Sequence, residues 1–255
     1  MSVIKKVCIF VPKIKNMETN ELLKQKVGEL VSKDYRTATV FKKYGIDFCC
    51  GGGKSIEDAC KKNGVNPDEL VQELKKIENA SNSTSHNYDE WSLSFLADYI
   101  ENTHHRYVEE NIPILLEFSQ KVAKVHGNSN PEVIKINDLF QDCVDELVPH
   151  MKKEELILFP YIRNLEKAKK NGEQAPLAPF GTVNNPINMM LHEHEFVGKK
   201  FEEIELLSNH YIPPTHACNT YRVLYAKLKE FHEDLLLHIH LENNILFPKA
   251  IALES

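Results

Sequence analysis

Hydrophobic positions recur with helical spacing over long stretches beyond about residue 88, and few alternating runs of β-branched residues compete with that pattern. Stretches rich in Gly, Pro and Asn interrupt it at 126–130, 171–185 and 209–214. The interruptions leave four long amphipathic segments, at 88–125, 131–169, 186–208 and 215–247. Four such helices of similar length pack most simply as an antiparallel four-helix bundle.

The chain before residue 79 carries shorter helical segments with clear capping signals. We expect a first helix from Thr19 to about residue 31, and a second that begins at Asp34 and ends at Gly45. A third is marked by a capping box at Ser55 and Asp58 and is closed by Gly64, and a fourth opens at Pro67. These segments predict a small helical domain.

A polar stretch of small residues, NASNSTSHN at 79–87, separates the two patterns and has the composition of a linker. We therefore divide the chain into a small helical domain at 1–78, a linker at 79–87 and a bundle at 88–255. The predicted fold class is all-α, with no sheet.

Composition and charge narrow the function. The chain has 255 residues, of which 42% are hydrophobic, and none of its apolar runs is long enough to span a bilayer. A net charge of −6 without a basic stripe argues against nucleic-acid binding. The apolar patch at 7–11 is too short for a signal peptide, so we expect a cytoplasmic protein. In a cytoplasmic protein, the six cysteines are expected to be reduced thiols, redox groups or metal ligands rather than disulfides.

An internal repeat carries the chemistry. The segments from His150 to Pro160 and from His238 to Pro248 both read H-x-x-x-E-x-x-I-L-F-P. Upstream, His105 precedes His150 by 45 residues and His194 precedes His238 by 44. The repeat predicts two matching helical hairpins, each supplying one histidine from its first helix and a His/Glu pair from its second. We expect the Ile-Leu-Phe parts to be core and the prolines to end helices.

Residues four apart share one face of a helix, so each His/Glu pair can address the same point in the bundle. Together with the upstream histidines, the pairs place four imidazoles and two carboxylates in the interior. A metal pair would supply the positive charge that two buried carboxylates need. This donor set suits two iron ions better than structural zinc, which more often takes a closed set rich in Cys. A single H-x-x-x-E is usually only a surface pair, but its repetition favours a metal centre.

With these motifs the chain resembles a known family, the hemerythrin-like iron–sulfur cluster repair di-iron proteins. Its hallmarks are the stretch TVFKKYGIDFCCGGG at 39–53 and the two His/Glu motifs, in that order. The resemblance covers the chain from about Val27 to Ala250. The first eighteen or so residues match nothing in the family pattern, and the three-glycine run is one residue longer than its commoner form.

The resemblance implies metal ligation by six residues, with Glu154 and Glu242 as the bridging carboxylates. The implied ligands are His105, His150, Glu154, His194, His238 and Glu242. His104 competes with His105, which we choose because the family's histidine pair is followed eight residues later by a proline, here Pro113.

Other histidines and acidic residues lie close to the proposed ligands in the sequence. His192 and His240 lie two residues from ligands, and we interpret them as bystanders on other helix faces. Three acidic residues stand four positions before a ligand histidine and could either orient the imidazoles or simply be solvated. They are Glu101, Glu146 and Asp234.

The adjacent Cys49 and Cys50 cannot easily grip one metal, and a disulfide between neighbours is strained. They lie in a glycine-rich loop before a helix that begins near Ser55, whose positive end could lower a thiol pKa. We interpret them as candidate redox or iron-relay thiols, with two inert loop cysteines as the alternative. The other four cysteines, Cys8, Cys60, Cys143 and Cys218, show no pairing pattern.

The resemblance implies a protein that repairs iron–sulfur clusters damaged by oxidative or nitrosative stress, by supplying iron rather than by turning over a substrate. Its cofactor would be two non-haem iron ions with an oxo or hydroxo bridge. Its partners would be proteins with damaged clusters, with NO or O2 as small ligands, and it would form a homodimer. The alternatives are a nitric oxide reductase, which would be an enzyme, and a hemerythrin-like O2 or NO sensor.

Overall fold

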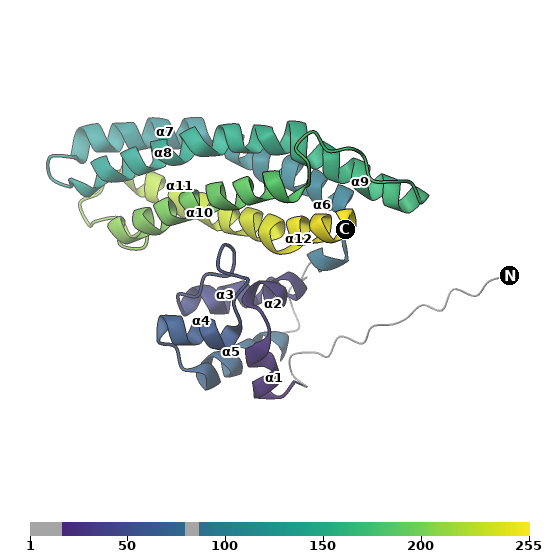
Figure 1. Ribbon diagram of the computed structural model, residues 1–255. Coiled ribbons are helices and arrows are strands. Elements are labelled where there is room, and N and C mark those ends of the chain that lie inside the picture. Colours follow the sequence, from purple (N-terminus) through teal and green to yellow (C-terminus); the bar gives the residue numbers. More distant parts are fainter. Residues whose placement is uncertain (1–16, 80–86) are drawn as a thin grey trace. The chain divides into compact units, whose positions relative to one another are not determined.

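The computed structural model describes residues 17–79 and 87–255, and helices are the only extended elements in those ranges. The all-α prediction is confirmed. The chain divides into two compact units between Asn87 and Tyr88 (Figure 1). The apolar patch at 7–11, Cys8 and the greater part of the proposed linker lie outside the described residues.

The described part of the N-terminal unit has five short helices around a small apolar core that includes Leu22, Leu30, Phe41 and Leu70. The helices are α1 (Thr19–Lys24), α2 (Val27–Lys33), α3 (Thr37–Lys43), α4 (Ile56–Asn63) and α5 (Pro67–Asn79). Two capping predictions are confirmed at α4. The Ser55 side chain accepts a hydrogen bond from the backbone N–H of Asp58, and Gly64 ends the helix in the left-handed conformation at a φ of 65°.

The prediction of one helix from Thr19 to residue 31 is wrong, because the chain becomes extended at Gln25 and starts a new helix at Val27. There it pairs with the segment that follows the two cysteines. The Val27 N–H donates to the Lys54 carbonyl at 3.0 Å, and the Gly28 N–H donates to the Gly52 carbonyl at 2.8 Å. These tertiary hydrogen bonds replace the helical ones and tie α2 to the cysteine loop.

The C-terminal unit is a bundle of four helical rods that run antiparallel to their neighbours in sequence (Figure 1). The first rod joins α6 (Leu93–Tyr99), η3 (Ile100–His105) and α7 (Arg106–His126). The second joins α8 (Glu132–Lys153), η4 (Glu154–Leu158) and α9 (Phe159–Asn171). The third is α10 (Asn184–Leu207), and the fourth joins α11 (Asn219–Leu241), η5 (Glu242–Leu246) and α12 (Phe247–Glu254). A short 3-10 turn, η2 (Tyr88–Glu90), precedes the bundle.

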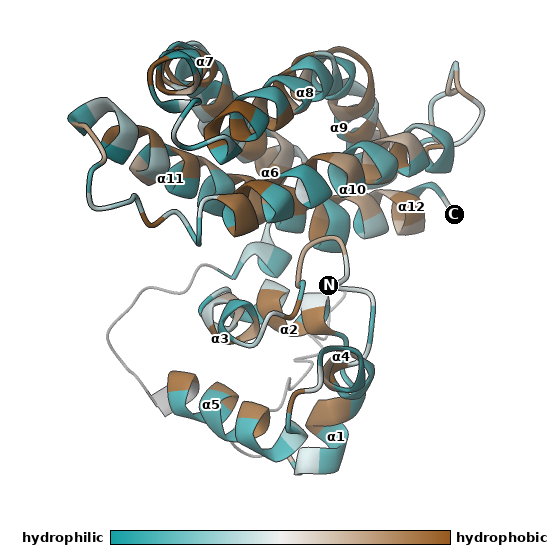
Figure 2. Ribbon diagram, turned by 90° about the vertical axis from the view of Figure 1, so that its left-hand side faces the viewer, coloured by the Kyte–Doolittle hydropathy of each residue, from teal (hydrophilic) through white to brown (hydrophobic). Residues whose placement is uncertain are grey.

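Hydrophobic and polar residues lie on different faces of these rods, as their sequence pattern predicts (Figure 2). Part of the interior is a cluster of aromatic rings in which Phe231 packs against Phe140 and Phe201, with centroids 5.7 and 5.6 Å apart. In the described part of the chain, no helix is long and apolar enough to cross a membrane.

The prediction that Pro160 and Pro248 end helices is wrong. Each is the second residue of a helix that continues, α9 to Asn171 and α12 to Glu254. A five-residue π-helical segment precedes each proline-containing helix, η4 in the second rod and η5 in the fourth. Because the rods are continuous through these prolines, each proline leaves a carbonyl of the preceding turn without its usual N–H donor.

Candidate metal centre

The six residues singled out by the repeat meet in the interior of the bundle, and each is at most 2% exposed. Three π-helical segments adjoin the positions they occupy. His105 is the last residue of η3, Glu154 is the first of η4 and Glu242 is the first of η5. π-Helical turns inside α-helices are rare and are frequently found at functional sites. The other three ligand candidates, His150, His194 and His238, lie on regular α-helix.

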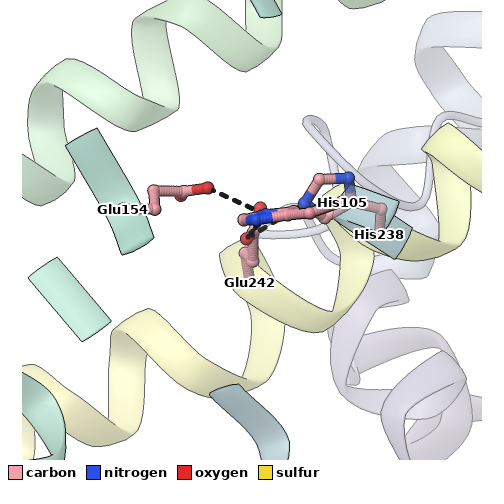
Figure 3. A group of neighbouring side chains, drawn as sticks. All are labelled: His105, Glu154, His238 and Glu242. Carbon is pink, nitrogen blue, oxygen red and sulfur yellow. Dashed lines mark hydrogen bonds and ion pairs between the residues drawn. The ribbon is translucent and has the colours of Figure 1, made fainter. Parts of the chain in front are cut away.

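The side chains form two groups that share both carboxylates. The first, which we call the His105 group, consists of His105, Glu154, His238 and Glu242 (Figure 3). The second, the His150 group, consists of His150, Glu154, His194 and Glu242. Within each group the potential ligand atoms all lie within 4.8 Å of one another. Each group takes one histidine from each half of the repeat, so neither hairpin alone can build a site.

Each carboxylate lies between histidines of the two groups. Glu154 Oε2 is 3.3 Å from Nε2 of both His105 and His150. Glu242 Oε1 is 3.1 Å from His238 Nε2, and its Oε2 is 3.1 Å from His194 Nε2. This arrangement suits two cations side by side, with both glutamates able to bridge them.

Several buried polar atoms fit a metal centre because they have no hydrogen-bond partner among the described residues. They are Nε2 of His105, both carboxylate oxygens of Glu154 and Oε2 of Glu242. A buried polar atom left without a partner is costly, and a buried carboxylate more so. Bound cations would satisfy all of these atoms at once, and imidazole with carboxylate is a donor set that divalent iron accepts.

The electrostatics of the groups also show how strongly they attract positive charge. Burial lowers the pKa of His105, but its contacts with Glu154 and Glu242 outweigh burial and raise the pKa to about 10. Burial lowers the pKa of His150 as well, and the charge of Glu154 outweighs it and raises the pKa to about 10. Burial raises the pKa of Glu242, yet the neighbouring histidines, His238 first, hold it well below its usual range. Metal binding to these histidines would displace protons.

Three of the four histidines have a hydrogen-bond partner on the ring nitrogen that faces away from the centre. His105 Nδ1 lies 3.0 Å from Glu155 Oε1 and His150 Nδ1 lies 2.7 Å from Glu193 Oε2. His194 Nδ1 lies 2.7 Å from Asn243 Oδ1. Such partners fix the ring orientation and make the metal-facing nitrogen a better ligand.

These partners are not the acidic residues that the sequence suggested. Glu101 pairs with Arg163 at 2.7 Å, and Asp234 pairs with His104 at 2.9 Å. Glu146 is half-buried. The residue that accepts a hydrogen bond from His150 is Glu193, not Glu146. A usable signal was present in the repeat, since a polar residue directly follows each glutamate: Glu155 and Asn243.

The phenylalanines of the repeat do more than fill the core. Phe159 stacks on His105 with ring centroids 5.6 Å apart, and Phe247 stacks on His194 with centroids 6.1 Å apart. The equivalent residue of each half therefore supports the equivalent histidine. The interpretation of the Ile-Leu-Phe parts as core is wrong at Ile157, which is 49% exposed, and it is incomplete at the two phenylalanines.

The remaining histidines near the centre belong to neither group. His104 is buried beside His105 and stacks on His238 with centroids 5.6 Å apart. His240 is buried and lies 3.2 Å from Asn244, whereas His192 is exposed on α10.

The cysteine pair lies in the loop between α3 and α4, organised by Asp47. One carboxylate oxygen of Asp47 accepts from the N–H groups of Cys49 and Cys50 at 2.9 and 3.0 Å, and the other from Gly51 at 2.7 Å. The Cys49 thiol donates to Asp47 Oδ1 at 3.2 Å, and the two sulfurs are 3.9 Å apart. Cys49 is buried and Cys50 is exposed.

The expectation of a lowered thiol pKa is wrong for Cys49. Its hydrogen bond with Cys50, burial, and the negative charge of Asp47 all raise the pKa of Cys49 well above its ordinary value. Helix α4 begins only at Ile56, and the backbone N–H groups of the loop point at Asp47 rather than at a sulfur. Of the other described cysteines, Cys60 and Cys143 are buried, while Cys218 is exposed.

The fold and the paired His/Glu groups define a hemerythrin-type cation-binding protein. In agreement, the model of the hemerythrin HHE cation binding domain matches residues 97–250. A second model, the ScdA N-terminal domain, described as a domain of unknown function (DUF542), matches residues 23–78.

Curated relatives match nearly the whole chain. The iron-sulfur cluster repair protein YtfE of Pectobacterium atrosepticum is 37% identical over 227 residues, covering 89% of this chain and 96% of the relative. The iron-sulfur cluster repair protein ScdA of Staphylococcus haemolyticus is 33% identical, covering 91% and 99%. YtfE of Yersinia pseudotuberculosis is 34% identical, covering 89% and 96%. The chain belongs to the family of YtfE and ScdA iron–sulfur cluster repair proteins.

Proposed function

We propose that this protein repairs iron–sulfur clusters damaged by oxidative or nitrosative stress, and that it does so by supplying iron. The observation that carries the proposal is the pair of buried His/Glu groups that share Glu154 and Glu242. Curated relatives across nearly the whole chain are named iron-sulfur cluster repair proteins, which supports the same activity. Nitric oxide reduction and gas sensing, the alternatives from the sequence, have no comparable support.

The proposed cofactor is two non-haem iron ions joined by an oxo or hydroxo bridge. The His105 group would hold one ion and the His150 group the other, with both glutamates bridging. When bound, the pair of ions would supply iron to a client and would offer coordination positions open to small ligands. Four protein donors of imidazole and carboxylate leave an octahedral ion incompletely ligated, so its release breaks fewer bonds than release from a closed cage.

The protein's own residues determine how that iron is held. The acceptors behind His105, His150 and His194 keep each ring turned toward the centre, and the stacked phenylalanines limit ring rotation. Complete burial of the two glutamates keeps water from competing for their oxygens.

The N-terminal unit is proposed to contact the damaged client through the cysteine loop. Cys50 presents an exposed thiol, and Cys49 lies buried behind it with its sulfur 3.9 Å away. An exposed and a buried thiol side by side suit a relay, in which Cys50 contacts the client's iron or sulfur first and Cys49 contacts it second. We further propose a cytoplasmic homodimer whose partners are proteins with damaged clusters, and that NO and O2 bind only as small ligands of the iron.

Anaerobic iron transfer tests this function. The ferrous protein is mixed with a dehydratase whose cluster has been damaged, and recovered dehydratase activity is followed. We expect recovery with the parent and loss of recovery with Glu154→Ala, whose carboxylate both groups share. Glu195→Ala is a matched control, because Glu195 is an exposed glutamate paired with Lys199 on α10. Recovery no faster than with an equal amount of free ferrous iron would overturn the proposal.

A further inference from the structure

The two halves of the centre are equivalent in most of their supporting contacts. In each half, the residue after the glutamate accepts a hydrogen bond from the first-helix histidine: Glu155 serves His105, and Asn243 serves His194. In each half, the phenylalanine of the repeat stacks on that same histidine. In these two contacts, His105 of the His105 group and His194 of the His150 group are held alike.

The equivalence fails at the residue before the first-helix histidine. In the second half this residue is Glu193, which accepts from His150 Nδ1 at 2.7 Å and is itself paired with Lys153. In the first half the same position is His104. The His104 ring stacks on His238 at an interplanar angle of 12°, and its Nδ1 is taken by Asp234 at 2.9 Å. A carboxylate acceptor on one side is thus replaced by an imidazole on the other.

His238 Nδ1 is left without support as a result. It is buried and has no hydrogen-bond partner among the described residues. The outward-facing nitrogens of the other three proposed ligand histidines all have such a partner. An imidazole whose outward nitrogen lacks an acceptor is a weaker ligand and is less firmly oriented. Loss of such an acceptor typically costs about 10- to 100-fold in metal affinity.

We infer that the two iron ions are inequivalent, and that the ion in the His105 group is the exchangeable one delivered to a client. Both histidines of the His150 group have acceptors, whereas only His105 is supported in the other group. His104 is the positioning residue that sets this difference. The inference rests on the proposed function, since it specifies which iron that function delivers.

The test is release of ferrous iron to the chelator ferrozine, followed by anaerobic stopped-flow absorbance on protein loaded with ferrous iron alone. We expect two phases of equal amplitude in the parent, with rates separated by about 10- to 100-fold. Two matched variants assign the phases, because each removes one glutamate acceptor from one group. Glu193→Ala should accelerate only the slow phase, and Glu155→Ala only the fast phase.

A third variant restores the missing acceptor. His104→Glu places a carboxylate where Glu193 stands in the other half, and it should slow the fast phase toward the slow one. If this variant misfolds because of its added buried charge, the two acceptor deletions still decide the assignment, with circular dichroism as the check on folding. A single phase for both ions in the parent, or acceleration of the fast phase by Glu193→Ala, would overturn the inference. Because ferrozine release involves no client, failure of cluster repair is read separately and bears only on the proposed function.

Discussion

Phe159 lies almost parallel to the imidazole of His105, with ring centroids 5.6 Å apart and an angle of 18° between their planes. The phenylalanine belongs to the ILFP part of the repeat, and the histidine comes from a different rod of the bundle. The contact therefore links the core packing of one helix to the orientation of a proposed ligand on another.

Truncation of this ring should affect stability and metal retention together. Phe159 is fully buried, so Phe159→Ala should lower the free energy of unfolding of the metal-free protein by about 3–5 kcal/mol. It should also reduce iron bound per chain, because His105 loses its stacking partner. Urea unfolding and iron analysis measure the two effects. Phe140→Ala removes a buried ring away from the proposed ligands, so it should lower the free energy of unfolding but leave the iron content unchanged. Equal iron loss in both variants would contradict a specific role of the contact between Phe159 and His105.

The shared glutamates should behave differently from the histidines on substitution. Glu242 belongs to both groups, so Glu242→Ala should abolish retention of both ions. His194 belongs to the His150 group alone, so His194→Ala should lower iron content by roughly half, since one donor set remains complete. Iron analysis after desalting checks both, and similar iron contents in the two variants would argue against bridging.

Glu166 supplies a pH-dependent contribution to bundle stability. Its carboxylate caps α6, accepting from the N–H groups of Leu93 at 3.2 Å and Ser94 at 3.1 Å. Burial raises the pKa of Glu166, but the hydrogen bonds from Ser94 outweigh burial and leave the pKa below its ordinary value of 4.5.

A carboxyl whose pKa is lowered by folding stabilises the protein above its unfolded pKa, and that stabilisation is lost as the pH falls through the folded value. Glu166→Gln should therefore cost about 1 kcal/mol at pH 7. The difference from the parent should shrink as the pH falls below about 4.5. Urea unfolding of the metal-free parent and variant at pH 7 and below pH 4.5 measures this difference in stability. A difference that does not change with pH would exclude the charged cap.

The two loop thiols should react at very different rates. Cys50 is exposed, whereas Cys49 is buried and has a raised pKa, so iodoacetamide should label Cys50 at least about tenfold faster. Asp47→Asn removes a negative charge that raises the Cys49 pKa, and should accelerate labelling of Cys49. Peptide mass spectrometry follows each site, with buried Cys60 as the internal control. Equal rates at Cys49 and Cys50 would contradict the arrangement of the loop.

The parts of the fold that local signals govern could be predicted well from the sequence. Ser55 and Gly64 bound α4 as expected, because caps and left-handed glycines act within a few residues. The break at Gln25 could not be predicted, because it depends on hydrogen bonds to the loop at 52–54 that are visible only in the folded chain.

The candidate centre shows the same division. The repeat singles out the six residues that converge, because residues four apart share a helix face and a twofold arrangement brings the two faces together. The acceptors behind the histidines were missed because an acidic residue four positions away on the same helix is not where the outward ring nitrogen points. His150 turns instead to Glu193 on α10, a neighbour that helix packing supplies.

The π-helical turns at η4 and η5 also limit which single-residue deletions this protein can tolerate. Each turn adds a residue between a glutamate and the phenylalanine that follows it. Deleting one residue there would restore an ordinary helix, but it would rotate everything downstream by about 100° about the helix axis. Phe159 or Phe247 would then face away from its histidine while the glutamate stayed in place. Single-residue deletions in these two stretches should therefore be tolerated far less well than substitutions at their exposed positions, such as Leu156.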